Sequence, residues 1–76
     1  MSTYNKLIHQ YKEELNNKGL SIEVGKAFLF ELCNEYSVNL YLDMDNEAKD
    51  VIETRFHNGM KRILDDEPMN YVMNIV

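Results

Sequence analysis

The chain has little of what covalent cross-linking or membrane insertion requires. Its single cysteine, Cys33, cannot form an internal disulfide bond, and no charged and apolar leader precedes the first predicted helix. The longest uncharged apolar run, residues 27–30, is much shorter than the roughly 20 residues that span a bilayer. These absences favour a protein of the reducing cytoplasm that does not enter a membrane.

Glycine is also scarce, and its distribution excludes one class of cofactor site. The three glycines stand alone at positions 19, 25 and 59, so the chain has no glycine-rich loop that could bind phosphate groups. Asp43, Asp45 and Glu47 alternate as the acids of a calcium loop do. However, Ala48 and Thr54 stand where that loop requires glycine and glutamate. We therefore expect neither a cofactor nor a metal ion in this segment.

Residues suited to nucleophilic catalysis are few and unconnected. Cys33 lies on the apolar stripe of a predicted helix, and free cysteine is among the most buried residue types, so we interpret it as a core residue. His9 and His57 lie on two other predicted helices, and no spacing links either of them to Cys33. We expect no catalytic residue among these 76 positions.

Basic residues are outnumbered, and the imbalance is local. Eight Lys and Arg face thirteen Asp and Glu, which gives the whole chain a net charge of −5. Residues 31–53 alone hold seven acids against one base, Lys49, and so carry −6. Such a surface repels nucleic acid and anionic lipid and attracts a basic protein. A solvated acidic face without a partner is the other interpretation. The acidic candidates for partner contact are Asp43, Asp45 and Glu47.

What the chain has in abundance is helical periodicity, with no alternating pattern that would indicate a strand. The apolar spacing and the capping residues predict a single all-α domain over residues 1–76, a small orthogonal bundle of four to five helices. Gly59 is a weak point inside the penultimate long helix. The predicted helices run from a cap at Ser2 or Thr3 to Gly19, from Ser21 through Cys33, for one turn after Asn39, from a cap at Asp45 to about Leu64, and from Pro68 to about Ile75.

The end of the sequence favours contact with a further domain. Apart from Asn74, residues 71–76 are apolar right up to the last residue, whereas natural termini are usually polar and frayed. Met69 and Met73 flank Tyr71 there, and flexible thioethers suit adaptable binding surfaces. We expect the natural chain to continue past Val76, and we expect Met69 and Met73 to contact the next domain.

One stretch has a recognisable signature. Residues 62–74, RILDDEPMNYVMN, resemble the RRxxGEPLxYIxG pattern that closes the N-terminal domain of the release factor glutamine methyltransferases, the HemK/PrmC family. Residues 23–32 are similar to the acidic-led, leucine-rich second helix of that family, and residues 40–43 fall where its turn does. Ile63 stands in place of the second Arg, Asp66 in place of the Gly, and Asn74 in place of the closing Gly.

The resemblance implies a helical domain that helps to bind a class I release factor and precedes a Rossmann-like methyltransferase domain. That later domain would bind S-adenosylmethionine and present an Asn-Pro-Pro-Tyr motif to the substrate glutamine, and neither this motif nor a methyl-donor loop occurs here. The parent would therefore be the enzyme, while this segment supplies docking surface alone. The alternative is a stand-alone acidic helical adaptor or inhibitor that binds a basic protein.

The chemistry of the signature residues can be interpreted without the family. Pro68 fixes the direction in which the last helix starts, and Glu67 favours the positive N-terminal end of that helix. Tyr71 lies one turn on, where it can pack back on the bundle, and Arg62 can form an ion pair with Glu67 or Asp66. We predict that Arg62, Glu67, Pro68 and Tyr71 form a hinge that orients a following catalytic domain. A well-made helix junction without that role is the other interpretation.

Overall fold

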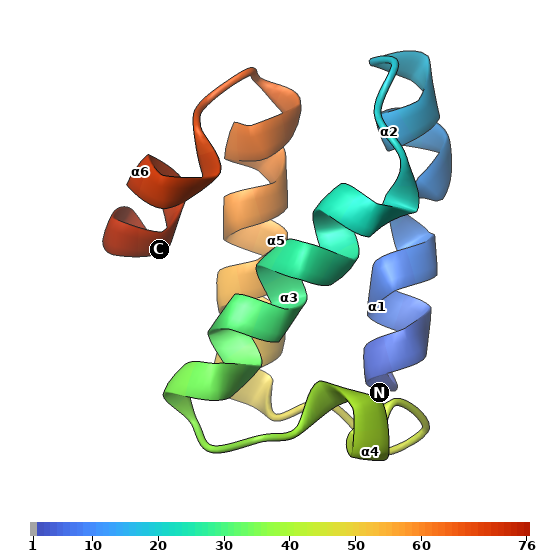
Figure 1. Cartoon of the computed structure of the whole chain (residues 1–76), viewed down its shortest axis with the longest axis vertical. Coiled ribbons are helices and arrows are strands. Elements are labelled where there is room, and N and C mark those ends of the chain that lie inside the picture. Colours follow the sequence, from blue (N-terminus) through green and yellow to red (C-terminus); the bar gives the residue numbers. More distant parts are fainter. Residues whose placement is uncertain (1) are drawn as a thin grey trace.

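The computed structural model describes residues 2–76 and confirms the all-α bundle. With α1 and α2 counted as one helix interrupted at Tyr11, the described residues form a bundle of five helices and contain no strand, only an isolated bridge between Thr3 and Glu47 (Figure 1). None of these helices is both long and apolar enough to cross a membrane. The helical segments are α1 (Tyr4–Gln10), α2 (Lys12–Asn17), α3 (Ile22–Glu35), α4 (Leu40–Asp43), α5 (Asp50–Leu64) and α6 (Met69–Ile75).

Three helix starts are as predicted. The Thr3 hydroxyl accepts a hydrogen bond from the Lys6 amide (3.2 Å), and the Ser21 hydroxyl accepts one from the Glu23 amide (3.2 Å). The Asn39 side chain accepts bonds from two amides of the first turn of α4. Each cap satisfies amide hydrogens that have no partner within the helix, which is why these short polar residues determine where the helices begin.

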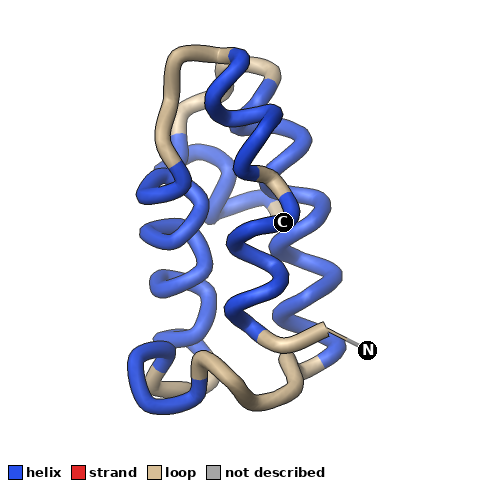
Figure 2. The backbone as a smooth tube through the Cα atoms, turned by 90° about the vertical axis from the view of Figure 1, so that its right-hand side faces the viewer, coloured by secondary structure: helices blue, strands red, loops and turns tan. Residues whose placement is uncertain are grey.

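The predicted cap at Asp45 is wrong, because α5 begins only at Asp50, after Lys49. The intervening loop is hydrogen-bonded to the start of the chain instead, as in the Ala48 amide, which donates to the carbonyl oxygen of Ser2 (2.8 Å). Figure 2 shows the chain start and this loop together at one end of the bundle. A backbone amide that is bonded to a distant segment is not available to a helical turn.

Three helix ends share one geometry. Gly19, Ser37 and Asp66 have positive φ angles of 76°, 57° and 68°, and each follows the last turn of a helix. At each end, backbone amides that follow the helix donate hydrogen bonds to carbonyl oxygens of its last turn. The Val38 amide, for example, donates to the carbonyl oxygen of Cys33 (3.0 Å). This is the Schellman arrangement, in which a left-handed residue satisfies carbonyls that the helix leaves unpaired. The predicted end at Gly19 is confirmed.

The same geometry predicts a stabilising substitution at Ser37, which is exposed. A left-handed residue other than glycine costs roughly 1–2 kcal/mol, and the larger unfolded-state entropy of glycine cancels roughly 0.5–1 kcal/mol of the gain. We expect Ser37→Gly to raise the free energy of unfolding by about 0.5 kcal/mol in urea titrations. Ser37→Val should lower it, because β-branched residues tolerate positive φ least. A less stable Ser37→Gly variant would contradict the assigned backbone conformation.

The core lies between α3 and the other helices, since α3 contacts every one of them, as its wide apolar stripe predicts. At its centre the rings of Phe28 and Phe56 stack with centroids 5.8 Å apart. Gly59 lies beside them and is no weak point. A Cβ atom there would lie 2.5 Å from Cε2 of Phe28 and closer still to Cζ. Glycine therefore lets α5 approach α3 closely. The buried apolar residues are Tyr4, Leu7, Ile8, Leu15, Phe28, Leu29, Leu32, Cys33, Val38, Leu40, Ile52, Phe56, Met60, Ile63 and Val72.

Candidate partner-binding surfaces

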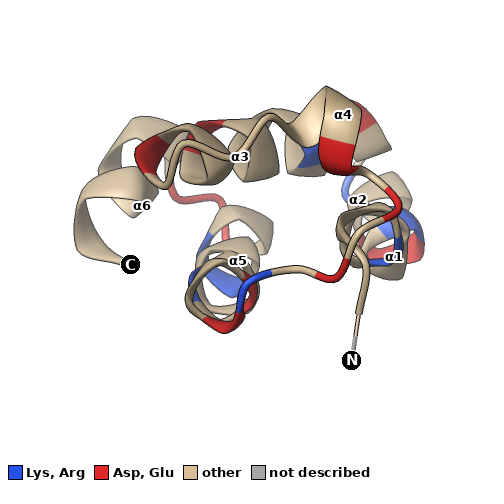
Figure 3. Cartoon of the chain, turned by 90° about the horizontal axis from the view of Figure 1, so that it is seen from below, with Lys and Arg blue, Asp and Glu red and all other residues tan. Residues whose placement is uncertain are grey.

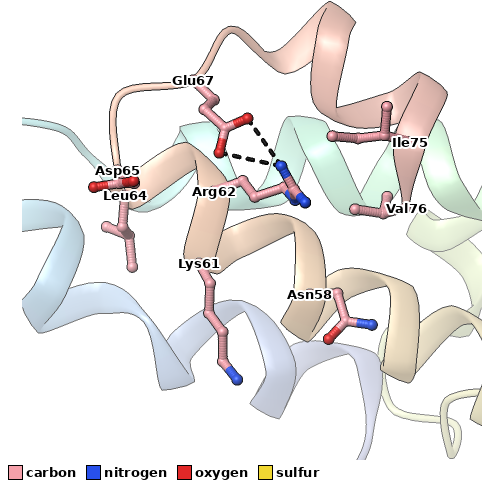
Figure 4. A pocket seen from close by; sticks show the side chains of 8 residues that line it. All are labelled: Asn58, Lys61, Arg62, Leu64, Asp65, Glu67, Ile75 and Val76. Atoms are coloured by element: carbon pink, nitrogen blue, oxygen red, sulfur yellow. Dashed lines mark hydrogen bonds and ion pairs between the residues drawn. The ribbon is translucent and has the colours of Figure 1, made fainter.

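The signature residues meet at the junction of α5 and α6. The Schellman arrangement at the end of α5 brings the Glu67 amide to 3.0 Å from the carbonyl oxygen of Arg62. Their side chains then form the predicted ion pair, with Nη1 of Arg62 3.1 Å from Oε1 of Glu67 (Figure 4). Asp66 points elsewhere and pairs with Lys18 at 3.2 Å. The junction thus carries two ion pairs, one of which ties it to the end of α2.

The rest of the signature sets the start of α6. Pro68 has φ −64° and ψ 140° and precedes the helix, so α6 begins at Met69, one residue later than predicted. Val72, one turn on, is buried in the core. Tyr71 is 53% exposed, so the prediction that it packs back on the bundle is wrong. A large exposed aromatic side chain next to the junction is available to another protein surface or domain.

The sequence did not single out Arg55, which fastens the end of α6. Its guanidinium donates to the carboxylate of Glu35 (2.9 Å) and to the hydroxyl of Tyr36 (3.1 Å) at the end of α3. It also donates to the carbonyl oxygens of Met73 (3.5 Å) and Val76 (2.9 Å) at the end of α6. The hydrogen bond to Glu35 raises the pKa of Arg55 above its ordinary value, so this group is permanently charged. Arg55 thereby joins three helices.

The predicted partner contacts do not gather into one site. Asp45 and Glu47 are exposed in the loop after α4, and Asp43 accepts a hydrogen bond from the Asn46 side chain (2.9 Å). Figure 3 shows acidic residues along this loop and on α4. Met73 is partly buried and packs against the core. Met69 lines a hollow on the outer face of α3, away from Asp45 and Glu47.

Besides the junction of α5 and α6, the outer face of α3 is a second candidate surface for binding a partner. The rings of Phe30 on α3 and Tyr41 on α4 lie 5.4 Å apart, and Lys26 lies 5.5 Å above the Tyr41 ring. Helical spacing with Val24 and Phe28 predicts Ala27 on the buried apolar stripe of this helix, but Ala27 is exposed here. Met69 lines the same hollow. We name this surface, defined by Ala27, Phe30, Tyr41 and Met69, the α3 groove.

Cys33 and His57, which were examined as possible catalytic residues, have contacts that stabilise the fold. Burial raises the pKa of the Cys33 thiol to about 11, so Cys33 is a neutral core residue as predicted. His57 hydrogen-bonds the hydroxyl of Tyr11, whose pKa burial raises, and Glu53 lies 3.8 Å from the other ring nitrogen of His57. A tyrosine with a raised pKa is a poorer nucleophile. Within residues 2–76 no three acidic, histidine or cysteine side chains are placed to hold a metal ion.

Comparisons with known proteins add nothing to this geometry. No protein-family model matches the chain, and no match was found among curated proteins or solved structures.

Proposed function

We propose that this chain is the substrate-recognition domain of a protein-glutamine methyltransferase, where it binds a peptide chain release factor. The observation that supports this most is the conformation of Asp66. The family signature has glycine at this place, and Asp66 has φ 68°, a conformation that glycine adopts without strain. The ion pair between Arg62 and Glu67 joins the first and last charged residues of the same signature. The signature residues thus serve one helix junction.

In this proposal the domain contributes binding and orientation, and the parent enzyme contributes the chemistry. A following Rossmann-like domain would bind S-adenosylmethionine, and methyl transfer to the side-chain nitrogen of a glutamine would take place there. Holding the release factor converts an encounter between two proteins into a positioned reaction, which can account for a large part of a rate enhancement. The helix junction and Arg55 would fix the direction in which the chain leaves α6.

Titration calorimetry of the 76-residue chain with a purified class I release factor tests the binding half of the proposal. We expect saturable binding with one domain per release factor. The hinge half is tested by placing Pro68→Ala in the parent enzyme, where we expect kcat/KM for release-factor methylation to fall about tenfold because the catalytic domain is misoriented. Unchanged methylation together with unchanged stability would end the hinge hypothesis.

A stand-alone acidic adaptor or inhibitor of a basic protein is the second candidate function. The observation that favours it is the exposure of Leu42, which is 80%, next to the acidic residues at the end of α4 and in the loop after it. The reading frame after Val76 discriminates between the two. Continuation into a glycine-rich strand-loop-helix and an Asn-Pro-Pro-Tyr stretch would support the methyltransferase, and a stop codon would support the adaptor.

A further inference from the structure

The α3 groove lies on the side of α3 that the other long helices leave uncovered. Seen from below, α1 and α5 lie beneath α3 (Figure 3), while α4 and α6 lie on opposite sides of it (Figure 1). The hollow between Tyr41 and Met69 has a volume of about 220 Å³. A second hollow of about 350 Å³ lies next to it, and both are lined by Phe30 and Tyr41. The two rings therefore separate a pair of neighbouring hollows.

The apolar part of this surface is unusually accessible. Tyr41 is 65% exposed and its neighbour Leu42 is 80% exposed, the two highest values among the large apolar side chains of residues 2–76. Both belong to a four-residue helix, α4, whose only buried residue is Leu40. An aromatic side chain that presents one apolar face and one hydroxyl to water is typical of the centre of a binding surface.

The charged part of the surface has one dominant sign. Glu23 and Glu31 line the hollow, and neither forms an ion pair with any side chain of residues 2–76. Lys26 is the one basic residue that lines it, and this ammonium group is placed over the Tyr41 ring. Asp43 lies on the same short helix as Tyr41, within the stretch of residues 31–53 that carries −6. Basic groups on a partner would be attracted to this rim.

We propose that the α3 groove binds a segment of the partner protein that presents an apolar side chain flanked by lysine or arginine. The apolar side chain would lie against Phe30 and Tyr41, and the cations would pair with Glu23 and Glu31. The Tyr41 ring face already holds one cation, that of Lys26, and a partner cation can take its place. This inference deepens the proposed function, and it rests on that proposal only for the identity of the partner.

Two synthetic peptides test the chemistry without the release factor. An amphipathic peptide of about 15 residues, with roughly equal leucine and lysine content, is titrated into the isotopically labelled chain, and a leucine–glutamate peptide of the same pattern is the control. We expect the leucine–lysine peptide to shift the amide resonances of Phe30, Glu31 and Tyr41, with weaker binding at higher salt. Absence of binding, equal binding of both peptides, or shifts confined to α2 would overturn the inference.

A matched pair of charge reversals locates the site. The double variant Glu23→Lys/Glu31→Lys alters the charge of the groove. The control, Glu13→Lys/Glu14→Lys, makes the same change in net charge on α2. All four side chains are exposed in the native chain. We expect the first to weaken peptide binding about tenfold or more and the second to change it less than about twofold. Equal effects would show that only net charge matters and would overturn the inference.

The same variants separate this inference from the proposed function. If the native chain binds the peptide at the groove but does not bind a class I release factor, the proposed function fails and the groove chemistry stands. If it binds the release factor and Glu23→Lys/Glu31→Lys leaves that affinity unchanged, the proposed function stands and the groove is not its docking surface. Competition between peptide and release factor would support both.

Discussion

Gly59→Ala is expected to lower the free energy of unfolding by about 3 kcal/mol, because overpacking a tight core typically costs roughly 1–3 kcal/mol and a backbone-fixed clash lies at the upper end. The new Cβ would overlap the ring of Phe28 and approach Cγ1 of Val72 at 3.2 Å. The Phe28 ring cannot retreat, since it is fully buried and stacked on Phe56. A 76-residue domain has a total stability of roughly 4–11 kcal/mol, so this is a large fraction of it.

Gly25→Ala is the matched control for this experiment. Gly25 also lies buried inside a helix, but a Cβ there would meet Cδ1 of Leu15 at 3.5 Å and Cε of Met60 at 3.7 Å, which are ordinary contacts. We expect Gly25→Ala to leave stability unchanged or to raise it by up to about 1 kcal/mol through helix propensity. Urea unfolding followed by circular dichroism measures both variants. Similar stabilities for the two would show that α5 does not approach α3 as closely as described.

Arg55→Met is expected to lower the free energy of unfolding by about 2 kcal/mol, the largest effect after that of Gly59→Ala. The ion pair with Glu35 accounts for little of this, because the Glu35 side chain is 45% exposed and water screens the interaction. The larger loss comes from the Tyr36 hydroxyl and the carbonyls of Met73 and Val76, which lose a charged donor. Methionine retains most of the apolar stem, so the variant isolates the guanidinium.

Amide hydrogen exchange shows which helices lose stability in the Arg55→Met variant. We expect the amides of Val72 and Val76, which bond to carbonyls of Pro68 and Val72, to lose protection more than amides of α3. Arg62→Met serves as the control, because it breaks an ion pair whose arginine side chain is 47% exposed and should cost less than about 1 kcal/mol. Unchanged protection of α6 in Arg55→Met would contradict the role assigned to this residue.

The sequence predicts what is determined within a few residues of the chain. Short polar caps and the left-handed Gly19 specify helix ends through bonds that reach only two to five positions away. The ion pair between Arg62 and Glu67 spans five positions, and it too was predictable from spacing. The junction could therefore be described in advance, apart from the exposure of Tyr71, the start of α6 at Met69 and the ion pair of Asp66 with Lys18.

What the sequence could not predict depends on contacts between distant segments. Asp45 has every property of a cap, but the backbone around it bonds to residues 2–5, far earlier in the chain. Arg55 looks like an ordinary charged residue on a helix until its partners, which lie 18 to 21 positions away, are known. The α3 groove forms because Tyr41 and Met69 arrive from two other helices beside Phe30. Periodicity alone assigned Ala27 to the core and gave no role to Phe30.

The pairing of the chain start with the loop after α4 links electrostatics to residues that carry no charge. Ser2 and Tyr4 are backbone partners of Ala48 and Asn46, and the Tyr4 hydroxyl accepts a hydrogen bond from the amide of Lys49. The backbone of this loop, which carries the carboxylates, is thus held in place by an uncharged segment. Without it the negative field would be averaged over many loop conformations, and an approaching basic protein would be attracted as strongly but oriented less. The first few residues therefore determine where on the molecule the negative charge of this loop lies.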